Sequence, residues 1–330
     1  CDYNYVFDPN VYLKRFFQEG IKGDYIFLID EAHNMVERSR QMYSAQIYKE
    51  DFLTVKRIMK EHSRSIEKAL EKCNKILLGM KRECENYTVY DTFGNMVFSF
   101  MRLVTLLDEF LQKANEFPGK KDVMDFYFEL RNFLNIYDLV DEHYVMYSEL
   151  EADGRFMLKL FCVDPSLNIQ KRLDKGKSAV FFSATFLPVN YYKSLLSTKK
   201  DNYAIYADST FDSKKRLLAM ATDVSTRYTR RSRSEYERIA GYINAVVTQK
   251  TGNYMVFFPS YKMMNDVADI YCEKYADETE LMLQKNNMSE AEREEFLDRF
   301  SEESDRTLVA FGIMGGIFGE GIDLKNDRLI

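Results

Sequence analysis

Residues 24–38 read DYIFLIDEAHNMVER, and this stretch decides the fold. Its apolar run, YIFLI at 25–29, stops at two adjacent carboxylates, Asp30 and Glu31, which a small residue separates from His33. A run this short and uniformly apolar predicts a strand that is buried on both faces, as in a parallel sheet. Ligands of open parallel sheets bind beyond the carboxyl ends of the strands. The stretch therefore predicts a ligand site next to Asp30 and Glu31.

The residue types at this strand end suit a metal–nucleotide site. Asp30 can help hold Mg²⁺ in such a site, and Glu31 can orient the attacking water. The alternative is a pair of solvated carboxylates that open a loop, with His33 hydrogen-bonded near a helix start. The complete D-E-A-H string favours the nucleotide site, because it should arise by chance in only about a few chains per thousand of this length.

Composition places the chain among ordinary globular proteins. Its 330 residues predict about two domains, and 46% are hydrophobic and 30% charged. No apolar stretch approaches the roughly 18 residues of a membrane span. Five cysteines without a C-x-x-C pair predict reduced thiols in a cytoplasmic protein. A net charge of −6 argues against nucleic-acid binding through the global field, although a local basic patch can still bind.

A long helical block interrupts an α/β pattern. Apolar residues recur at helical spacing within residues 66–80, 100–111 and about 120–150, which predicts amphipathic helices. Strands are expected again at 156–163 and 179–182. Because the block lies between strands of one expected sheet, we interpret it as an insertion.

From residue 217 the alternation of strands and helices is regular. Strands are expected at 217–221, 254–258, 281–283 and 307–311, and helices at 234–248, 261–275 and 290–300. This order predicts a parallel sheet covered by helices.

Hydroxyl groups follow two further predicted strands. Ser183 and Thr185, in the sequence S-A-T, can hydrogen-bond a neighbouring carboxylate or histidine, or else cap a turn. Ser260 opens a helix, where it can cap the helix or help bind a phosphate.

A glycine-rich stretch and an arginine cluster complete the candidate site residues. The stretch FGIMGGIFGEGID at 311–323 can bring its backbone close to a phosphate, or it is a flexible surface loop. Its candidate contact residues are Gly315, Gly316, Gly319, Glu320, Gly321 and Asp323. The cluster of Arg227, Arg230 and Arg231 can contact a DNA backbone, or it is a solvated face.

Four motifs in this order and spacing resemble those of the XPD/DinG-like helicases of superfamily two, the DEAH-type iron–sulfur helicase family. They are D-E-A-H at 30–33, S-A-T at 183–185, F-F-P-S at 257–260 and G-E-G-I-D at 319–323. The stretches DYNYVFDP at 2–9 and DPS at 164–166 resemble that family too.

The resemblance implies an α/β fold with RecA-like, P-loop NTPase-like motor domains, the first partial, and an inserted α-helical arch domain. The expected organisation is the rear part of motor domain 1 at 1–48, the helical arch-like insertion at 49–154, the return to motor domain 1 at 155–208, and a C-terminally truncated motor domain 2 at 209–330.

The resemblance also implies roles. Asp30 would help hold Mg²⁺ and Glu31 would activate water, while His33, Ser183 and Thr185 would couple ATP hydrolysis to domain movement. Ser260 and the glycine-rich stretch would contact nucleotide or nucleic acid. The expected ligands are ATP and single-stranded DNA, along which a monomeric motor would move 5′ to 3′, in DNA repair. An iron–sulfur cluster is expected in the full-length parent, with its ligands outside this chain.

Departures from the family pattern lead us to expect an internal piece of a longer helicase. No G-x-x-x-x-G-K-[ST] loop occurs in the 330 residues, and no arginine-rich motif follows Asp323. We therefore expect the chain to be inactive by itself. Two alternatives stay open: an ATPase-deficient nucleic-acid-binding module, and a related motor that acts on RNA or is coupled to a nuclease.

Overall fold

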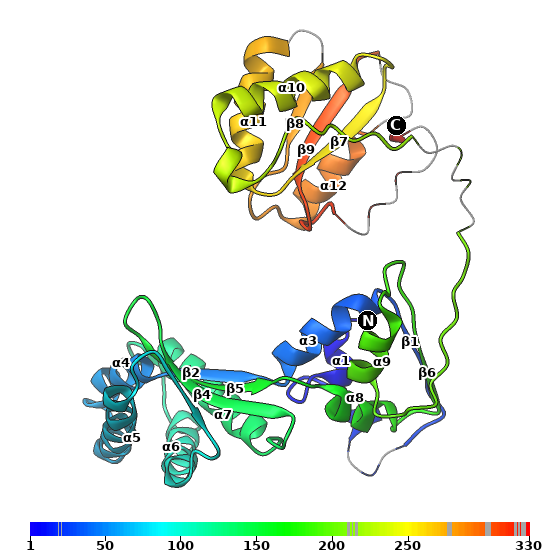
Figure 1. Ribbon diagram of the computed structural model, residues 1–330. Helices are drawn as coiled ribbons and strands as arrows, with labels where there is room; N and C mark the ends of the chain where they lie inside the picture. Colours follow the sequence, from blue (N-terminus) through cyan, green and yellow to red (C-terminus); the bar gives the residue numbers. More distant parts are fainter. Residues whose placement is uncertain are drawn as a thin grey trace. The chain divides into compact units, whose positions relative to one another are not determined.

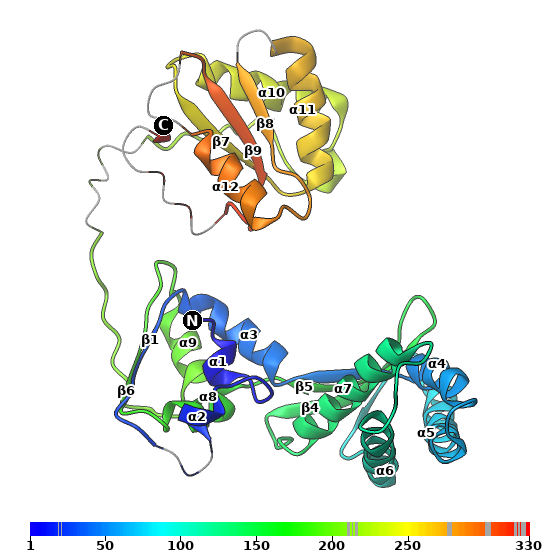
Figure 2. The ribbon, with the colours of Figure 1, turned by 180° about the vertical axis from the view of Figure 1, so that it is seen from behind.

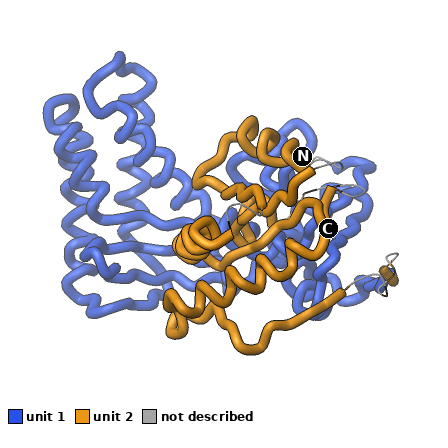
Figure 3. Tube along the Cα trace, turned by 90° about the horizontal axis from the view of Figure 1, so that it is seen from above, with its two compact units in different colours: residues 1–207 blue, residues 208–330 orange. Residues whose placement is uncertain are grey.

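The computed structural model describes residues 1–18, 20, 22–209, 212, 214, 217–275, 279–300, 305–319, 322, 324 and 328–330. It divides into two compact units, residues 1–207 and 208–330, which Figure 3 shows in different colours. The division lies one residue from the expected start of motor domain 2. None of the described helices is both long and apolar enough to cross a membrane.

The first unit contains a two-stranded parallel sheet that positions the D-E-A-H sequence. Strands β1 (Ile26–Ile29) and β6 (Ser178–Phe181) pair in register, with Ile29 opposite Phe181. The helices of this part are α1 (Asn4–Phe7), α2 (Lys14–Phe17), α3 (Met35–Met42), α8 (Ser166–Leu173) and α9 (Val189–Leu196) (Figure 1).

The prediction that β1 is buried on both faces is wrong. Phe27 and Ile29 are 8% and 5% exposed, whereas Ile26 and Leu28 are 62% and 70% exposed. Side chains alternate across a strand, and the described residues cover only the Phe27 face. The strand itself and its parallel pairing are as predicted.

The insertion is a four-stranded antiparallel sheet with four helices, so the prediction of an all-helical block is wrong. The sheet has the order β2-β5-β4-β3. Its strands are β2 (Ala45–Tyr48), β3 (Tyr87–Tyr90), β4 (Tyr144–Leu150) and β5 (Phe156–Cys162), and the helices are α4 (Lys49–Met59), α5 (Arg64–Glu83), α6 (Asn95–Leu111) and α7 (Lys120–Tyr137) (Figure 1).

Two strands account for the difference. The helix expected to reach about residue 150 ends at Tyr137, and in β4 the buried Tyr144, Met146 and Ser148 follow the two-residue period of a strand. Strand β5 was expected in the parallel sheet, but it pairs antiparallel with β2 and β4. Leu160 of β5 lies opposite Ala45 on one side and Met146 on the other.

Helices α4 to α7 enclose an aromatic core. Phe52 of α4 is fully buried; its ring centroid lies 5.3 Å from that of Phe100 on α6 and 4.9 Å from that of Phe126 on α7. The buried side chains of α5 recur every three or four residues, as the sequence predicts, and they are Ile66, Leu70, Cys73 and Leu77.

The second unit is a parallel sheet with helices on both faces, as predicted (Figure 2). Its strands β7 (Asn253–Phe258), β9 (Leu308–Ile313) and β8 (Glu280–Leu283) lie in that order, and its helices are α10 (Arg233–Val247), α11 (Tyr261–Tyr275) and α12 (Glu290–Asp298). Val309 and Phe311 of β9 pack in the cluster with α10 and α11, whereas Leu308 and Ala310 pack against Phe296 of α12.

The strand predicted at 217–221 is wrong. These residues form no strand, and Leu217, Leu218 and Met220 are 92%, 81% and 83% exposed. No described strand pairs with them, and their apolar character had suggested a buried position.

Candidate nucleotide site

The ends of β1 and β6 bring the D-E-A-H and S-A-T sequences to one edge of the first sheet. The Phe182 N–H donates to the Ile29 carbonyl at 3.0 Å, and the Ala32 N–H donates to the Phe182 carbonyl at 3.1 Å. The segments that follow β1 and β6 therefore stay hydrogen-bonded to each other beyond the last strand residues. This edge, at the carboxyl ends of parallel strands, is where such sheets bind ligands.

Three polar side chains meet at this edge. The Nδ1 atom of His33 lies 2.8 Å from the Ser183 hydroxyl and 3.2 Å from a carboxylate oxygen of Glu31. The same hydroxyl lies 3.5 Å from that oxygen. Which of His33 and Ser183 donates depends on the imidazole tautomer. A change in the position or charge of the Glu31 carboxylate would therefore alter its contacts with His33 and with Ser183 of the S-A-T sequence.

Thr185 joins this cluster through its backbone. Its N–H donates to the Ser183 hydroxyl oxygen at 3.2 Å, which closes the turn after β6, and its side chain is exposed. Ser183 therefore makes both contacts that its position suggested, one within the turn and one to the D-E-A-H sequence.

The backbone at Glu31 adopts an uncommon conformation. Its φ of +47° lies in the left-handed region, which costs a residue other than glycine on the order of 1–3 kcal/mol. Asp30 supports the turn, because its Oδ1 accepts the Glu31 N–H at 2.8 Å. The short helix η1 (Ala32–Asn34) follows at once. Asp30 thus contacts the backbone while Glu31 contacts His33, an arrangement that suits two different roles.

Tyr3 also holds this turn, a role that its sequence context does not predict. Its single hydroxyl proton is shared between the Asp30 carbonyl and, at 3.1 Å, the Glu31 carbonyl. The guanidinium of Arg38 lies over its ring, 5.4 Å from the centroid, and pairs with Asp2 at 3.0 Å. Burial, helped by the charges of Asp30 and Glu31 against that of Arg38, raises the pKa of Tyr3, so the hydroxyl stays a donor.

A second candidate edge lies at the carboxyl ends of β7 and β9 in the other unit. Ser260 follows β7 and accepts the Met263 N–H at 3.3 Å, so it caps α11, the simpler of its two predicted roles. The Met314 N–H donates to the Phe258 carbonyl at 2.9 Å, which keeps the glycine-rich stretch beside Ser260. Ser260 and Gly315 therefore follow neighbouring strand ends.

The described part of the glycine-rich stretch forms tight turns. Gly315 has a φ of +70°, and a Cβ on Gly319 would lie 3.1 Å from the Gly315 nitrogen. Phe318 is buried and stacks on Phe296, with ring centroids 4.3 Å apart. Gly316 lies between these turns, and Glu320, Gly321 and Asp323 lie outside the described residues. The anchored Phe318 argues against an unattached surface loop.

The arginine cluster is partly engaged within its own unit. Arg230 donates to the Asp223 carbonyl at 2.9 Å and lies 3.2 Å from the buried carboxylate of Glu235. Arg231 donates to the backbone of Thr226 and lies over the ring of Tyr228. Arg227 is exposed, and no side-chain hydrogen bond or ion pair is recorded for it among the described residues. A DNA contact of this cluster stays a prediction.

Comparisons with known proteins show similarity to helicases. The Helicase C-terminal domain family matches residues 243–330, which contain β7, β9 and Ser260. Over 322 aligned residues the chain is 26% identical to the ATP-dependent DNA helicase XPD of Sulfolobus acidocaldarius. The aligned region covers 92% of this chain and 52% of that protein. The chain thus spans about half the length of this curated relative.

Solved structures agree on the fold. The structure of S. tokodaii Xpd4 matches 94% of this chain and 62% of its own chain, with a TM-score of 0.54 at 14% identity. An apo XPD structure matches 98% of this chain and 62% of its own with a TM-score of 0.50 at 18% identity. The family match and the curated relative confirm the resemblance to XPD-like helicases, and the solved structures confirm the mixed α/β architecture with parallel sheets.

Proposed function

We propose that the chain works as part of an ATP-dependent DNA helicase that moves 5′ to 3′ on single-stranded DNA. The contact of Glu31 with both His33 and Ser183 carries this proposal, because it links a water-activating carboxylate to the end of the neighbouring strand. Similarity to a protein named ATP-dependent DNA helicase XPD supports the reaction and the polymer.

Asp30 and Glu31 take separate roles in this proposal. The exposed carboxylate of Asp30 is a hard oxygen ligand of the kind Mg²⁺ prefers. Among the described residues, only its Oδ1 has a recorded contact, with the Glu31 N–H. Bound Mg²⁺ would neutralise charge on the phosphates. Glu31 orients the attacking water, and His33 with Ser183 and Thr185 reports its state to the segment after β6.

The remaining candidates would serve ligand binding. Ser260 offers a helix start, and the turns at Gly315, Gly316 and Gly319 offer a close approach of the backbone to phosphates. Glu320, Gly321 and Asp323, outside the described residues, stay predicted contacts from the sequence. Arg227, Arg230 and Arg231 would contact the DNA backbone. We further propose a monomeric helicase that acts in DNA repair and whose longer form holds an iron–sulfur cluster.

ATP turnover by two forms of the protein tests the proposal. The full-length protein should release phosphate from ATP faster when single-stranded DNA is added. The 330-residue chain should not, because its sequence has no G-x-x-x-x-G-K-[ST] loop. Stimulation by RNA in place of DNA would favour the RNA motor, and a full-length protein that binds DNA without ATP turnover would favour the binding module.

Replacing Tyr3 with Phe should lower the ATP turnover of the full-length protein by about tenfold, since it removes the hydroxyl proton that the two carbonyls share, a hydrogen bond worth roughly 1 kcal/mol, from the turn that positions Glu31. ATP affinity should change little, because Tyr3 holds the turn rather than the nucleotide. The control is Tyr5→Phe, whose hydroxyl has no recorded bond among the described residues. Equal turnover of the two variants would remove the positioning role from Tyr3.

A further inference from the structure

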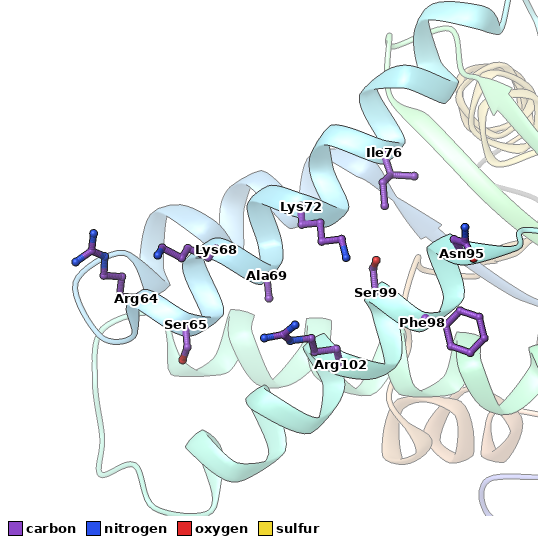
Figure 4. A pocket seen from close by; sticks show the side chains of 10 residues that line it. All are labelled: Arg64, Ser65, Lys68, Ala69, Lys72, Ile76, Asn95, Phe98, Ser99 and Arg102. Carbon is purple, nitrogen blue, oxygen red and sulfur yellow. The ribbon is translucent and has the colours of Figure 1, made fainter.

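A groove between α5 and α6 of the insertion is separate from every residue of the candidate nucleotide site. It encloses a cavity of about 1040 Å³ (Figure 4). Figure 4 shows Lys72 and Arg102 extending from the two helices into the space between them. Ala69 of α5 and the buried Ser99 of α6 contribute short side chains to its lining, which leaves the space open.

The groove concentrates positive charge. Arg64, Lys68 and Lys72 of α5 and Arg102 of α6 line it, and none of the lining residues is a carboxylate. Along α5 the three cations recur every four residues, so they lie about 6 Å apart on one helix face. All four are exposed, and none has an ion pair recorded among the described residues.

Two other lysines of the insertion are neutralised by carboxylates. Lys56 of α4 and Lys81 of α5 pair with Glu71 at 3.6 Å and Glu50 at 2.9 Å. Like charges four residues apart on a helix repel each other. In a chain with a net charge of −6, an unneutralised row of this kind is complementary to a polyanion.

An aromatic side chain identifies the kind of polyanion. Phe98 of α6 lines the same groove and is 70% exposed. Sites for single-stranded nucleic acid combine a basic groove that follows the backbone with aromatic rings on which bases stack. A run of Asp and Glu residues would pair with the cations, but their side chains carry no ring that could stack on Phe98.

We propose that the α5–α6 groove binds a single-stranded nucleic-acid segment, with phosphates along Arg64, Lys68 and Lys72 and one base stacked on Phe98. Arg102 closes the groove from the opposite helix. The site goes beyond the proposed motor function, because it gives the insertion a nucleic-acid contact of its own that uses no residue of the ATP site.

Fluorescence anisotropy with labelled oligothymidylate and the 330-residue chain tests the charges. The double variant Lys68→Gln with Lys72→Gln should bind more weakly, and its slope of log K against log salt should become less negative by about 1.4, two contacts at 0.7 each for a single strand. The matched control is Lys171→Gln with Lys177→Gln, two exposed lysines outside the groove. Equal slopes for the two double variants would overturn the site.

Phe98→Ala tests the base contact, and Phe128→Ala on α7, 54% exposed in the parent chain, is its control. Loss of the stacked ring should weaken binding about fivefold or more, whereas the control should bind like the parent chain. If Phe98→Ala binds normally and polyglutamate displaces the oligonucleotide as well as unlabelled DNA does, the groove takes an acidic protein instead. These outcomes concern binding alone, so they are distinguishable from a failure of the ATPase proposal.

Discussion

Glu31→Gln in the full-length protein should lower DNA-stimulated ATP turnover by about 10²- to 10⁴-fold, the range expected when a catalytic base is lost. Gln keeps the size of the side chain and can still contact His33, but it lacks the charge that draws a proton from water. Phosphate release measures the turnover, and binding of a fluorescent ATP analogue should remain detectable, because Asp30 and the rest of the site are retained.

Two comparisons make this result interpretable. Glu37→Gln removes another exposed carboxylate, six residues along the chain on α3, and should leave turnover unchanged. The Glu31 side chain is 51% exposed, so its replacement should not alter the melting temperature appreciably. Turnover of Glu31→Gln equal to that of the parent protein would exclude Glu31 as the water-activating residue.

Phe52→Ala should have the largest effect on stability, lowering the free energy of unfolding of the first unit by about 3–5 kcal/mol. The fully buried ring contacts Phe100 and Phe126, so its loss leaves a cavity where α4, α6 and α7 meet. Denaturant titration of the 330-residue chain, followed by circular dichroism, measures the change.

The matched control for this prediction is Phe128→Ala, which removes the same side chain from an exposed position on α7. It should change the free energy of unfolding by no more than about 0.5 kcal/mol, as is usual on a surface. A loss below about 1 kcal/mol for Phe52→Ala would mean that the three helices do not share one packed core.

The sequence predicted best those features that depend on neighbouring residues. The bounds of α11, Tyr261–Tyr275, are those expected, because a capping Ser260 and a regular apolar face both act locally. The end of β1 before Asp30 could also be predicted, because the apolar run at 25–29 stops at Asp30 and Glu31. The contact of His33 with Ser183 could be anticipated because both follow strands of one expected parallel sheet.

Features that depend on distant partners were missed. Strand β2 pairs with β5, whose residues lie more than a hundred positions away, and no local pattern reveals that pairing. In β4 the two-residue alternation was present, but the preceding helical pattern obscured it. Tyr3 acts through carbonyl groups 27 and 28 residues away, which an aromatic residue in a polar segment does not indicate.

Because β2 pairs with β5, the insertion begins and ends on two neighbouring strands. The chain enters through β2 and leaves through β5, and Ala45 lies directly opposite Leu160 (Figure 1). The Cys162 N–H also donates to the Ser44 hydroxyl at 3.0 Å, which fastens the two crossings together at their base. Paired residues in antiparallel strands lie only about 5 Å apart, so a short turn could bridge them. Evolution could therefore lengthen, exchange or remove this domain while the spacing of the D-E-A-H and S-A-T edge stays the same.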